Sequence, residues 1–435
     1  MQKTSNLSPL AAVSGLLLIA VALGIIFNRV ARHRPLKNYV PEFVALMLLA
    51  GALYLAGVYI VQRGKCSLAA LFIILAASVI FRLFFLSLSP TLSEDVYRYQ
   101  WEGRIVRAGI NPYTVYPAMP ELRWAQNPGH PVETGRTTPT LYPPLSEAAF
   151  AGVRTVAGYK RLFTALDLAT IALILFLLAA TQEPLQRVLI YAWNPAVLIA
   201  FAASGHNDSL ANMMLLTAIL LIIGRRRALS IAFLALAVLS KLFPVFLLPV
   251  FLKRTRWSYA GIFGGLVLLG YFPFLAAHGH LFRGLSDFAA GWEGNDSLFR
   301  LLRMAGNSRA QAELVAGVLL LGLIIYVLKM RADLLRSGLI IIAGLLLLSP
   351  NAFPWYFTWM VPFLCFYPDA ALLLMTVTCV LGYSPIVAYA AGLPYKNMPL
   401  MLALEYVPVF GLLAWRGLHP SPVAQAAGGI SSPGR

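Results

Sequence analysis

Charged residues are scarce in this sequence, and acidic residues are scarcer still. Only 12% of the 435 residues are charged, and 17 acidic residues stand against 34 basic ones. Hydrophobic residues make up 59% and the mean hydropathy is +0.75, so a soluble chain of this length could not bury its apolar surface. The composition excludes a soluble globular protein and predicts an all-α polytopic membrane protein.

Two further classes are excluded by what is rare. The three cysteines (Cys66, Cys365 and Cys379) lie in or beside apolar segments, so no disulfide framework is expected. A net charge of +17 would fit a nucleic-acid partner, but the basic residues occur in short runs between apolar segments. Such runs are typical of loops that face anionic lipid headgroups, and we expect no nucleic-acid partner.

The apolar segments divide the chain into three parts. Residues 1–66 hold N-terminal transmembrane helices, the first of which we expect to be retained and not cleaved as a signal peptide. Residues 67–415 form the main transmembrane module, interrupted by polar loops at 89–158 and 278–309. Residues 416–435 are rich in Gly, Ser and Pro, and we predict a disordered tail. Counting all segments gives roughly 12–14 transmembrane helices.

Three basic loops predict the orientation: Gly224–Ala228, Lys253–Arg256 and Lys329–Arg336. Placing them in the cytoplasm puts both long polar loops outside, together with the turns at 205–208 and 350–356. One short loop, Asn28–Lys37, carries four basic residues and yet falls outside in this scheme. We give more weight to the three loops that agree.

The polar stretch that follows the third apolar segment predicts an amphipathic helix over Asp95–Ala108. Tyr97 and Trp101 begin an apolar stripe, whereas Asp95 and Glu102 fall on another side with Arg98. Ser93 is the expected N-cap. The helix is predicted to lie flat on the membrane surface, with its acids facing water or a cavity. The alternative is a solvated helix whose charges pair with one another.

Two neighbouring apolar segments are too short to cross a membrane. Leu229–Ser240 and Leu242–Leu252 would each rise only about 18 Å as helices, against a hydrocarbon core of about 30 Å. They meet at Lys241, just before Pro244, so we expect a broken helix that lines a polar cavity. Lys241 either meets a lipid phosphate there or extends to the interface.

Other polar residues also have two interpretations. Arg82 and Asp167 are expected to form a structural ion pair within the membrane. His206, Asn207 and Asp208 either bind a substrate or satisfy the start of the next helix. The residues of the second loop and of the 350–356 turn are either interfacial anchors or site residues. Their common side of the membrane favours one shared site.

An ordered set of motifs resembles the bacterial GT-C-type integral-membrane glycosyltransferases, the mannosyltransferase-like proteins that use polyprenyl-phosphate sugars. The motifs span about residues 80–365 and are SEDVYRYQWEGRIVRAGINPY from Ser93, LYPPLSE from Leu141, GHNDSLA from Gly205, SKLFP from Ser240, WEGNDSLF from Trp292 and SPNAFPWY from Ser349. The resemblance implies a GT-C-like helical bundle whose large first outer loop carries juxtamembrane helices. Glu102 departs from the family's Asp, and Phe353 replaces a His.

The resemblance also implies roles for individual residues. The catalytic carboxylate falls on Asp95, which we expect to be the base, with Glu94 second. The candidate substrate-binding residues are Arg98, Trp101, Glu102, Arg104, Asn111, Tyr113, Tyr142, His206, Asn207, Asp208, Lys241, Asn295, Trp355 and Tyr356. Cations among them would hold a leaving phosphate, and aromatic rings would stack on sugars.

The activity implied is transfer of a hexose, here mannose, from a polyprenyl-phosphate sugar to a lipid-linked or cell-envelope acceptor outside a bacterial plasma membrane. Such a transfer needs mainly one base for the acceptor hydroxyl. Glu94, Asp95 and Asp208 are also candidate ligands of a divalent metal, which carboxylate count alone does not establish. The alternative function is a transporter or flippase for lipid-linked glycans, although no internal repeat supports it. A non-catalytic lipid-binding relative is a third option.

Overall fold

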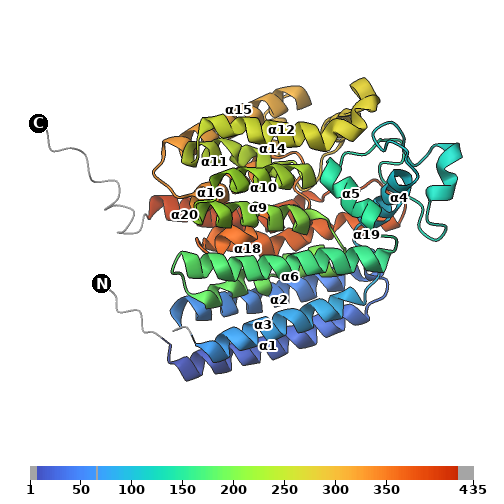
Figure 1. Cartoon of the computed structure of the whole chain (residues 1–435). Coiled ribbons are helices and arrows are strands. Elements are labelled where there is room, and N and C mark those ends of the chain that lie inside the picture. The colour runs from blue at the N-terminus through green and yellow to red at the C-terminus, as the bar shows by residue number, and fades with distance from the viewer. Residues whose placement is uncertain (1–6, 65–66, 420–435) are drawn as a thin grey trace, which may run out of the picture.

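The computed structural model describes residues 7–64 and 67–419, and within them the chain is helical, with no strand beyond isolated bridges. The helices lie side by side in one bundle (Figure 1). Their bounds are α1 Pro9–Arg32, α2 Val40–Arg63, α3 Leu68–Leu86, α4 Asp95–Arg107, α5 Pro144–Gly152, α6 Val156–Ala180, α7 Leu189–Ala192, α8 Pro195–Leu198, α9 Asp208–Ile223, α10 Arg227–Ser240, α11 Leu248–Arg254, α12 Ala260–Tyr271, α13 Arg283–Gly291, α14 Leu298–Met304, α15 Arg309–Lys329, α16 Leu334–Leu348, α17 Val361–Leu364, α18 Ala370–Thr378, α19 Pro385–Ala390 and α20 Pro399–Leu418.

Eight helical segments of the described chain are long and apolar enough to cross a membrane. They are Pro9–Arg32, Leu36–Arg63, Leu68–Leu86, Val156–Ala180, Trp257–His280, Arg309–Lys329, Ala370–Ala390 and Pro399–Leu418. A ninth is formed if the pair Leu185–Ala192 and Pro195–Ala203, bent by 57°, counts as one span. The structure confirms the all-α polytopic class, with fewer full-length spans than the 12–14 predicted. Three apolar helices (α9, α10 and α16) are too short to pass the length test.

The two ends of the bundle differ in what they carry. Helices α4 and α5 cover one end, and the described chain begins and finishes at the opposite end (Figure 1). The three basic loops used for orientation lie at that opposite end, where Lys253 and Arg254 donate to the carbonyls of Leu328 and Ala332. The long polar loops and the 205–208 and 350–356 turns lie at the α4 end. The grouping of loops inferred from charge therefore matches the grouping in space.

Helix α4 forms nearly where the sequence predicts it, but its surroundings differ. It begins at Asp95 and ends at Arg107, and Gly109 follows with a φ of +75° that favours glycine. The N-cap is Glu94 rather than Ser93, whose hydroxyl accepts from the Asp95 amide at 3.3 Å. Glu102 is fully buried, so the expectation that the acids of this helix face water or a cavity is wrong for Glu102, whereas Asp95 stays part-exposed. The reason is that α5 and the start of α6 cover the helix.

The predicted breaks within the membrane are confirmed. Helix α10 ends at Ser240, Lys241 is extended (φ −156°, ψ 144°), and a 3-10 segment over Phe243–Leu247 leads into α11. The Pro354–Trp359 segment is likewise a single 3-10 stretch followed by the short helix α17. Both breaks face the end of the bundle that α4 covers. The Arg82–Asp167 ion pair is also confirmed, at 2.6 Å and fully buried.

Two predictions concern residues at or beyond the limits of the described chain. Helix α20 continues to Leu418, so the prediction of a disordered tail is wrong for residues 416–418. Residues 420–435 lie outside the described residues. Cys66 also lies outside them, whereas Cys365 and Cys379 are buried free thiols.

Candidate active site

The site is built on the tight turn before α9. Gly205 adopts a φ of +73°, and a Cβ there would come within 3.0 Å of the Lys160 side chain. Only glycine fits both the conformation and the contact. The turn buries the next three side chains (His206, Asn207 and Asp208) completely. His206 and Asn207 meet side chains of α4, whereas Asp208 meets Lys241 and Trp359. Their burial shows that they do more than cap a helix, since Asn207 makes no side-chain cap bond to α9.

Asp95 and His206 face each other across this turn. The Asp95 Oδ2 lies 3.3 Å from the His206 Nδ1, and the Asp95 side chain keeps 29% of its surface exposed while His206 has none. The imidazole stacks on Trp355 with ring centroids 4.1 Å apart, and Trp355 in turn stacks on Phe353 at 4.9 Å. Phe353 therefore serves as an aromatic wall behind the imidazole.

The surroundings of Asp95 keep its carboxyl ionised. Burial acts to raise its pKa, but the contact with His206 and the positive charges of His206 and Lys241 outweigh burial, so the pKa is lowered from its usual value. Glu94 points elsewhere: it is exposed, and its carboxylate accepts from Thr134 at 3.2 Å. Of the two candidate bases, Asp95 is the one held in the site.

Lys241 approaches the same turn from the broken helix. Its Nζ lies 3.3 Å from the Asp208 carboxylate and 3.4 Å from the Asn207 Oδ1. The ammonium also lies over two aromatic rings, Tyr142 at 5.7 Å and Tyr356 at 5.3 Å. Only 12% of the Lys241 side chain is exposed, so it does not extend to an open interface.

Three residues that hold this arrangement were missed in the sequence. The Trp359 Nε1 donates to Asp208 at 2.7 Å, and the Tyr99 hydroxyl donates to Asn207 at 3.2 Å. Asn207 itself donates to the Ser146 Oγ at 2.9 Å. Tyr99 and Ser146 lie within motifs of the resemblance, and Trp359 lies shortly after the last one. Spacing gives no sign of which of these side chains point inward.

Several polar atoms of the site have no protein partner. The His206 Nε2 and the Trp355 Nε1 are buried and make no hydrogen bond within the described part of the chain. Buried donors are normally satisfied, so two such groups beside one exposed carboxylate indicate a place where a polar ligand binds.

Other candidates stabilise the first loop and do not face Asp95. Arg98 binds Glu102 at 2.7 Å and the carbonyls of Gly135 and Thr138, and Arg104 binds two carbonyls of the 125–126 segment. Trp101 is buried in a separate apolar cluster with Ile105. Their proposed substrate contacts stay predictions without geometric support.

The remaining candidates connect segments around the site. The Tyr113 hydroxyl donates to the Tyr142 carbonyl at 2.8 Å, and Asn111 donates to the Phe274 carbonyl at 3.2 Å. Asn295 donates to Glu405 of α20 at 2.8 Å and to the Ala352 carbonyl at 2.9 Å. Asn295 thus anchors the second polar loop to the segment that carries Trp355 and Tyr356.

The geometry of the described residues gives no support for a bound metal ion. Among residues 7–64 and 67–419, no group of three or more His, Cys, Asp or Glu side chains converges as a metal site. Glu94 faces Thr134, and Asp208 is already paired with Lys241 and Trp359. These three carboxylates do not form the ligand set considered from the sequence.

Comparison with known proteins places the chain in a family. A search of curated proteins found no match. A family model covers residues 10–255, which include Asp95, the 205–208 turn and Lys241 but not Trp355 or Tyr356. The mannosyltransferase-like resemblance read from the motifs is confirmed by this match. The chain belongs to the alpha-(1->6)-mannopyranosyltransferase family, whose N-terminal domain its residues 10–255 match.

Proposed function

We propose that this membrane mannosyltransferase takes mannose from a polyprenyl-phosphate carrier and transfers it to a lipid-linked or cell-envelope acceptor. The observation that carries the proposal is the pairing of an ionised, part-exposed Asp95 with the buried turn that also holds Lys241. Asp95 can accept a proton from the acceptor hydroxyl, and Lys241 can stay beside the departing phosphate.

The step would be a single displacement at the anomeric carbon. The acceptor hydroxyl forms the new C–O bond while its proton goes to Asp95. The bond to the phosphate oxygen breaks, and the lipid phosphate leaves with the electron pair beside Lys241. The family description names α-(1→6) mannosyl transfer, so the acceptor would be the O6 hydroxyl of a sugar residue. A single displacement that yields an α-linkage requires a donor with the β-configuration.

The proposal places the site on the extracytoplasmic face. Three basic loops lie at the opposite end of the bundle from Asp95, and such loops normally face the cytoplasm. The arginines of the first outer loop carry little weight in this rule, because long loops are translocated largely regardless of charge. A water-soluble, membrane-impermeant reagent against a cysteine introduced at exposed Thr114 in inverted and right-side-out vesicles would test this placement.

The central test replaces Asp95. Asp95→Asn should lower the rate of mannose transfer about 10²- to 10⁴-fold, the usual contribution of a general base. Purified protein, polyprenyl-phosphate mannose and an O6-bearing mannoside acceptor would be used, with product measured by mass spectrometry. Glu94→Gln, at the adjacent residue, is the matched control variant and should retain most of the activity.

Wild-type turnover by the Asp95→Asn variant would remove Asp95 as the base. Loss of activity in Glu94→Gln alone would move that role to Glu94. If neither variant nor the wild type forms product but labelled lipid-linked sugar crosses vesicles, the flippase alternative gains.

A further inference from the structure

The loop between α1 and α2 breaks the charge rule that the rest of the chain follows. The four basic residues of the 28–37 segment, of which Arg29 and Arg32 belong to the last turn of α1, lie at the Asp95 end of the bundle. Arg34 donates to Ser87 at 3.0 Å there, and the Lys37 amide donates to Thr91 at 3.3 Å. Ser87 and Thr91 belong to the connection that runs from α3 into α4. The rule that basic loops face the cytoplasm does not explain a basic cluster at this end of the bundle, so another cause is needed.

The charge of this loop is only partly compensated within the protein. Glu42 lies 2.6 Å from Arg29 and 3.0 Å from His33, so one carboxylate serves two neighbours. Arg32 makes no hydrogen bond or ion pair with the residues that the structure describes, and Arg34 donates only to neutral oxygens. Two guanidinium groups therefore remain without an acidic partner there.

Both of these arginines line a cavity of about 400 Å³ between the last turns of α1 and α3. Its polar lining comes from Asn28, Arg32, Arg34 and Ser87, and its apolar lining includes Leu83 and Phe84. Arg34 is already oriented by its bonds to the Ala31 carbonyl and to Ser87. The cavity thus offers donors at one side and an apolar wall at the other.

The apolar wall continues along the outside of the bundle. Val21 and Ile25 of α1 and Val79, Ile80 and Leu83 of α3 are exposed, although both helices qualify as membrane spans. In a bilayer these side chains face acyl chains. The cavity therefore sits where lipid tails meet their headgroups.

We propose that this cavity binds the phosphodiester headgroup of an anionic phospholipid, with Arg32 and Arg34 on the phosphate and the acyl chains along α1 and α3. Arginine suits the role because its planar fork matches phosphate oxygens. The site is separate from the Asp95 turn, and the inference does not depend on the proposed donor or acceptor. It also explains why a basic loop lies at this end of the bundle.

The test measures lipid binding directly. Detergent-solubilised full-length protein would be titrated with phosphatidylglycerol, and bound lipid counted by native mass spectrometry. Arg32→Gln/Arg34→Gln should weaken the tightest binding event about 30-fold, since each basic residue near anionic lipid contributes about 1 kcal/mol. The matched control is Arg226→Gln/Arg227→Gln, which removes the same charge from exposed positions at the opposite end.

Weakened binding in the cavity variant with unchanged binding in the control supports the site. Equal weakening in both variants, or none in either, overturns it. Displacement of the phospholipid by equimolar polyprenyl phosphate overturns the phospholipid assignment and makes the cavity part of the carrier's path. If the double variant does not fold, Arg32→Gln alone serves, because that side chain makes no hydrogen bond or ion pair within the described chain.

Discussion

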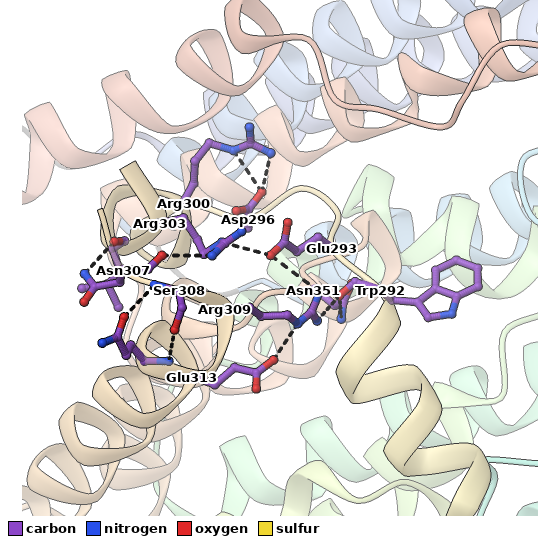
Figure 2. A network of polar contacts seen from close by, with 12 residues as sticks. Trp292, Glu293, Asp296, Arg300, Arg303, Asn307, Ser308, Arg309, Glu313 and Asn351 are labelled. Atoms are coloured by element: carbon purple, nitrogen blue, oxygen red, sulfur yellow. Dashed lines mark hydrogen bonds and ion pairs between the residues drawn. The ribbon is translucent and has the colours of Figure 1, made fainter. Parts of the chain in front are cut away.

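The two long polar loops of this protein, 89–158 and 278–309, use charge in opposite ways. In the first loop, the acids Asp95, Glu102 and Glu147 are each held by very few partners, and two of the three are fully buried. In the second, arginines and acids on and around α13–α15 form a network in which several groups have two partners (Figure 2).

The contacts of the second network show how its charges are shared. Arg303 and Arg309 both lie 3.6 Å from Glu293, and Arg309 also binds Glu313 at 2.8 Å. Most of these side chains are at least a quarter exposed, so water screens the loss of any one of them. Charges with few partners and little water have strongly altered pKa values, and such groups are typical of functional sites.

Within the first loop, two acids of helix α4 show how neighbouring groups set the pKa of a carboxyl. Positive groups lower the pKa of Asp95, whereas burial beside Glu147 raises the pKa of Glu102 despite its bond to Arg98. Glu147 lies within hydrogen-bonding reach of Glu102, and burial together with that neighbour holds its pKa well above the usual value. Glu102 and Glu147 each keep one buried carboxylate oxygen without another partner, which fits a proton shared between the two carboxyls.

The largest effect outside Asp95 should come from Lys241. Lys241→Ala removes the charge beside the departing phosphate and leaves Asp208 buried without its counter-ion. We expect donor affinity to fall roughly 10- to 100-fold, because hydrogen bonds to charged groups contribute about 1.5–3 kcal/mol. Binding of labelled polyprenyl-phosphate mannose measures this, and Lys241→Arg should recover part of it. Unchanged affinity in Lys241→Ala would leave the lysine a purely structural role.

Replacing the partner of Asp95 should shift the pH dependence. His206→Phe keeps a ring to stack on Trp355 but removes the group that lowers the Asp95 pKa, so the effect of burial prevails and the pKa rises. The base is active when ionised, so the acid limb of the kcat/KM profile should move to higher pH by on the order of one unit. An acid limb that stays in place would show that another group controls it.

A smaller effect is expected on stability from the Glu102–Glu147 pair. A carboxyl whose folded pKa is raised binds its proton in the folded state above pH 4.5, so stability falls as pH rises through that window. Glu147→Gln removes this loss and places an N–H near Glu102. Its melting temperature at pH 8 should exceed that of the wild type, by an amount equivalent to about 1 kcal/mol. A lower melting temperature at pH 8 would contradict the shared proton.

The smallest effect should come from the second network. Glu293→Gln removes one shared negative charge, but Arg309 keeps Glu313 and Arg303 keeps the Asn307 carbonyl at 2.9 Å (Figure 2). We expect a stability change below about 1 kcal/mol and activity within roughly twofold of the wild type. A loss comparable to that of Lys241→Ala would show that the second loop acts on the site as directly as the first.

Much of the fold was predictable because apolar runs and proline positions act locally. The helix at Asp95, the break at Lys241 and the Arg82–Asp167 pair all follow from residue type and spacing. The burial of Glu102 did not, because it depends on α5, which lies some 40 residues away in the chain. The predicted number of transmembrane helices was too high for a related reason, because helices surrounded by protein can be short or bent.

Sequence alone determined the membrane class, the family resemblance and the acidic motif that contains the candidate base, because hydropathy and motif order are properties of the chain. Only the tertiary structure showed that Asp95, and not Glu94, faces the 205–208 turn. It also showed that Arg98 and Arg104 bind within the first loop and that Trp359 reaches Asp208. The physical reason is that a helix side chain's partners are chosen by segments that fold against it from far along the chain. Motif spacing does not indicate which of those distant segments will pack against the helix.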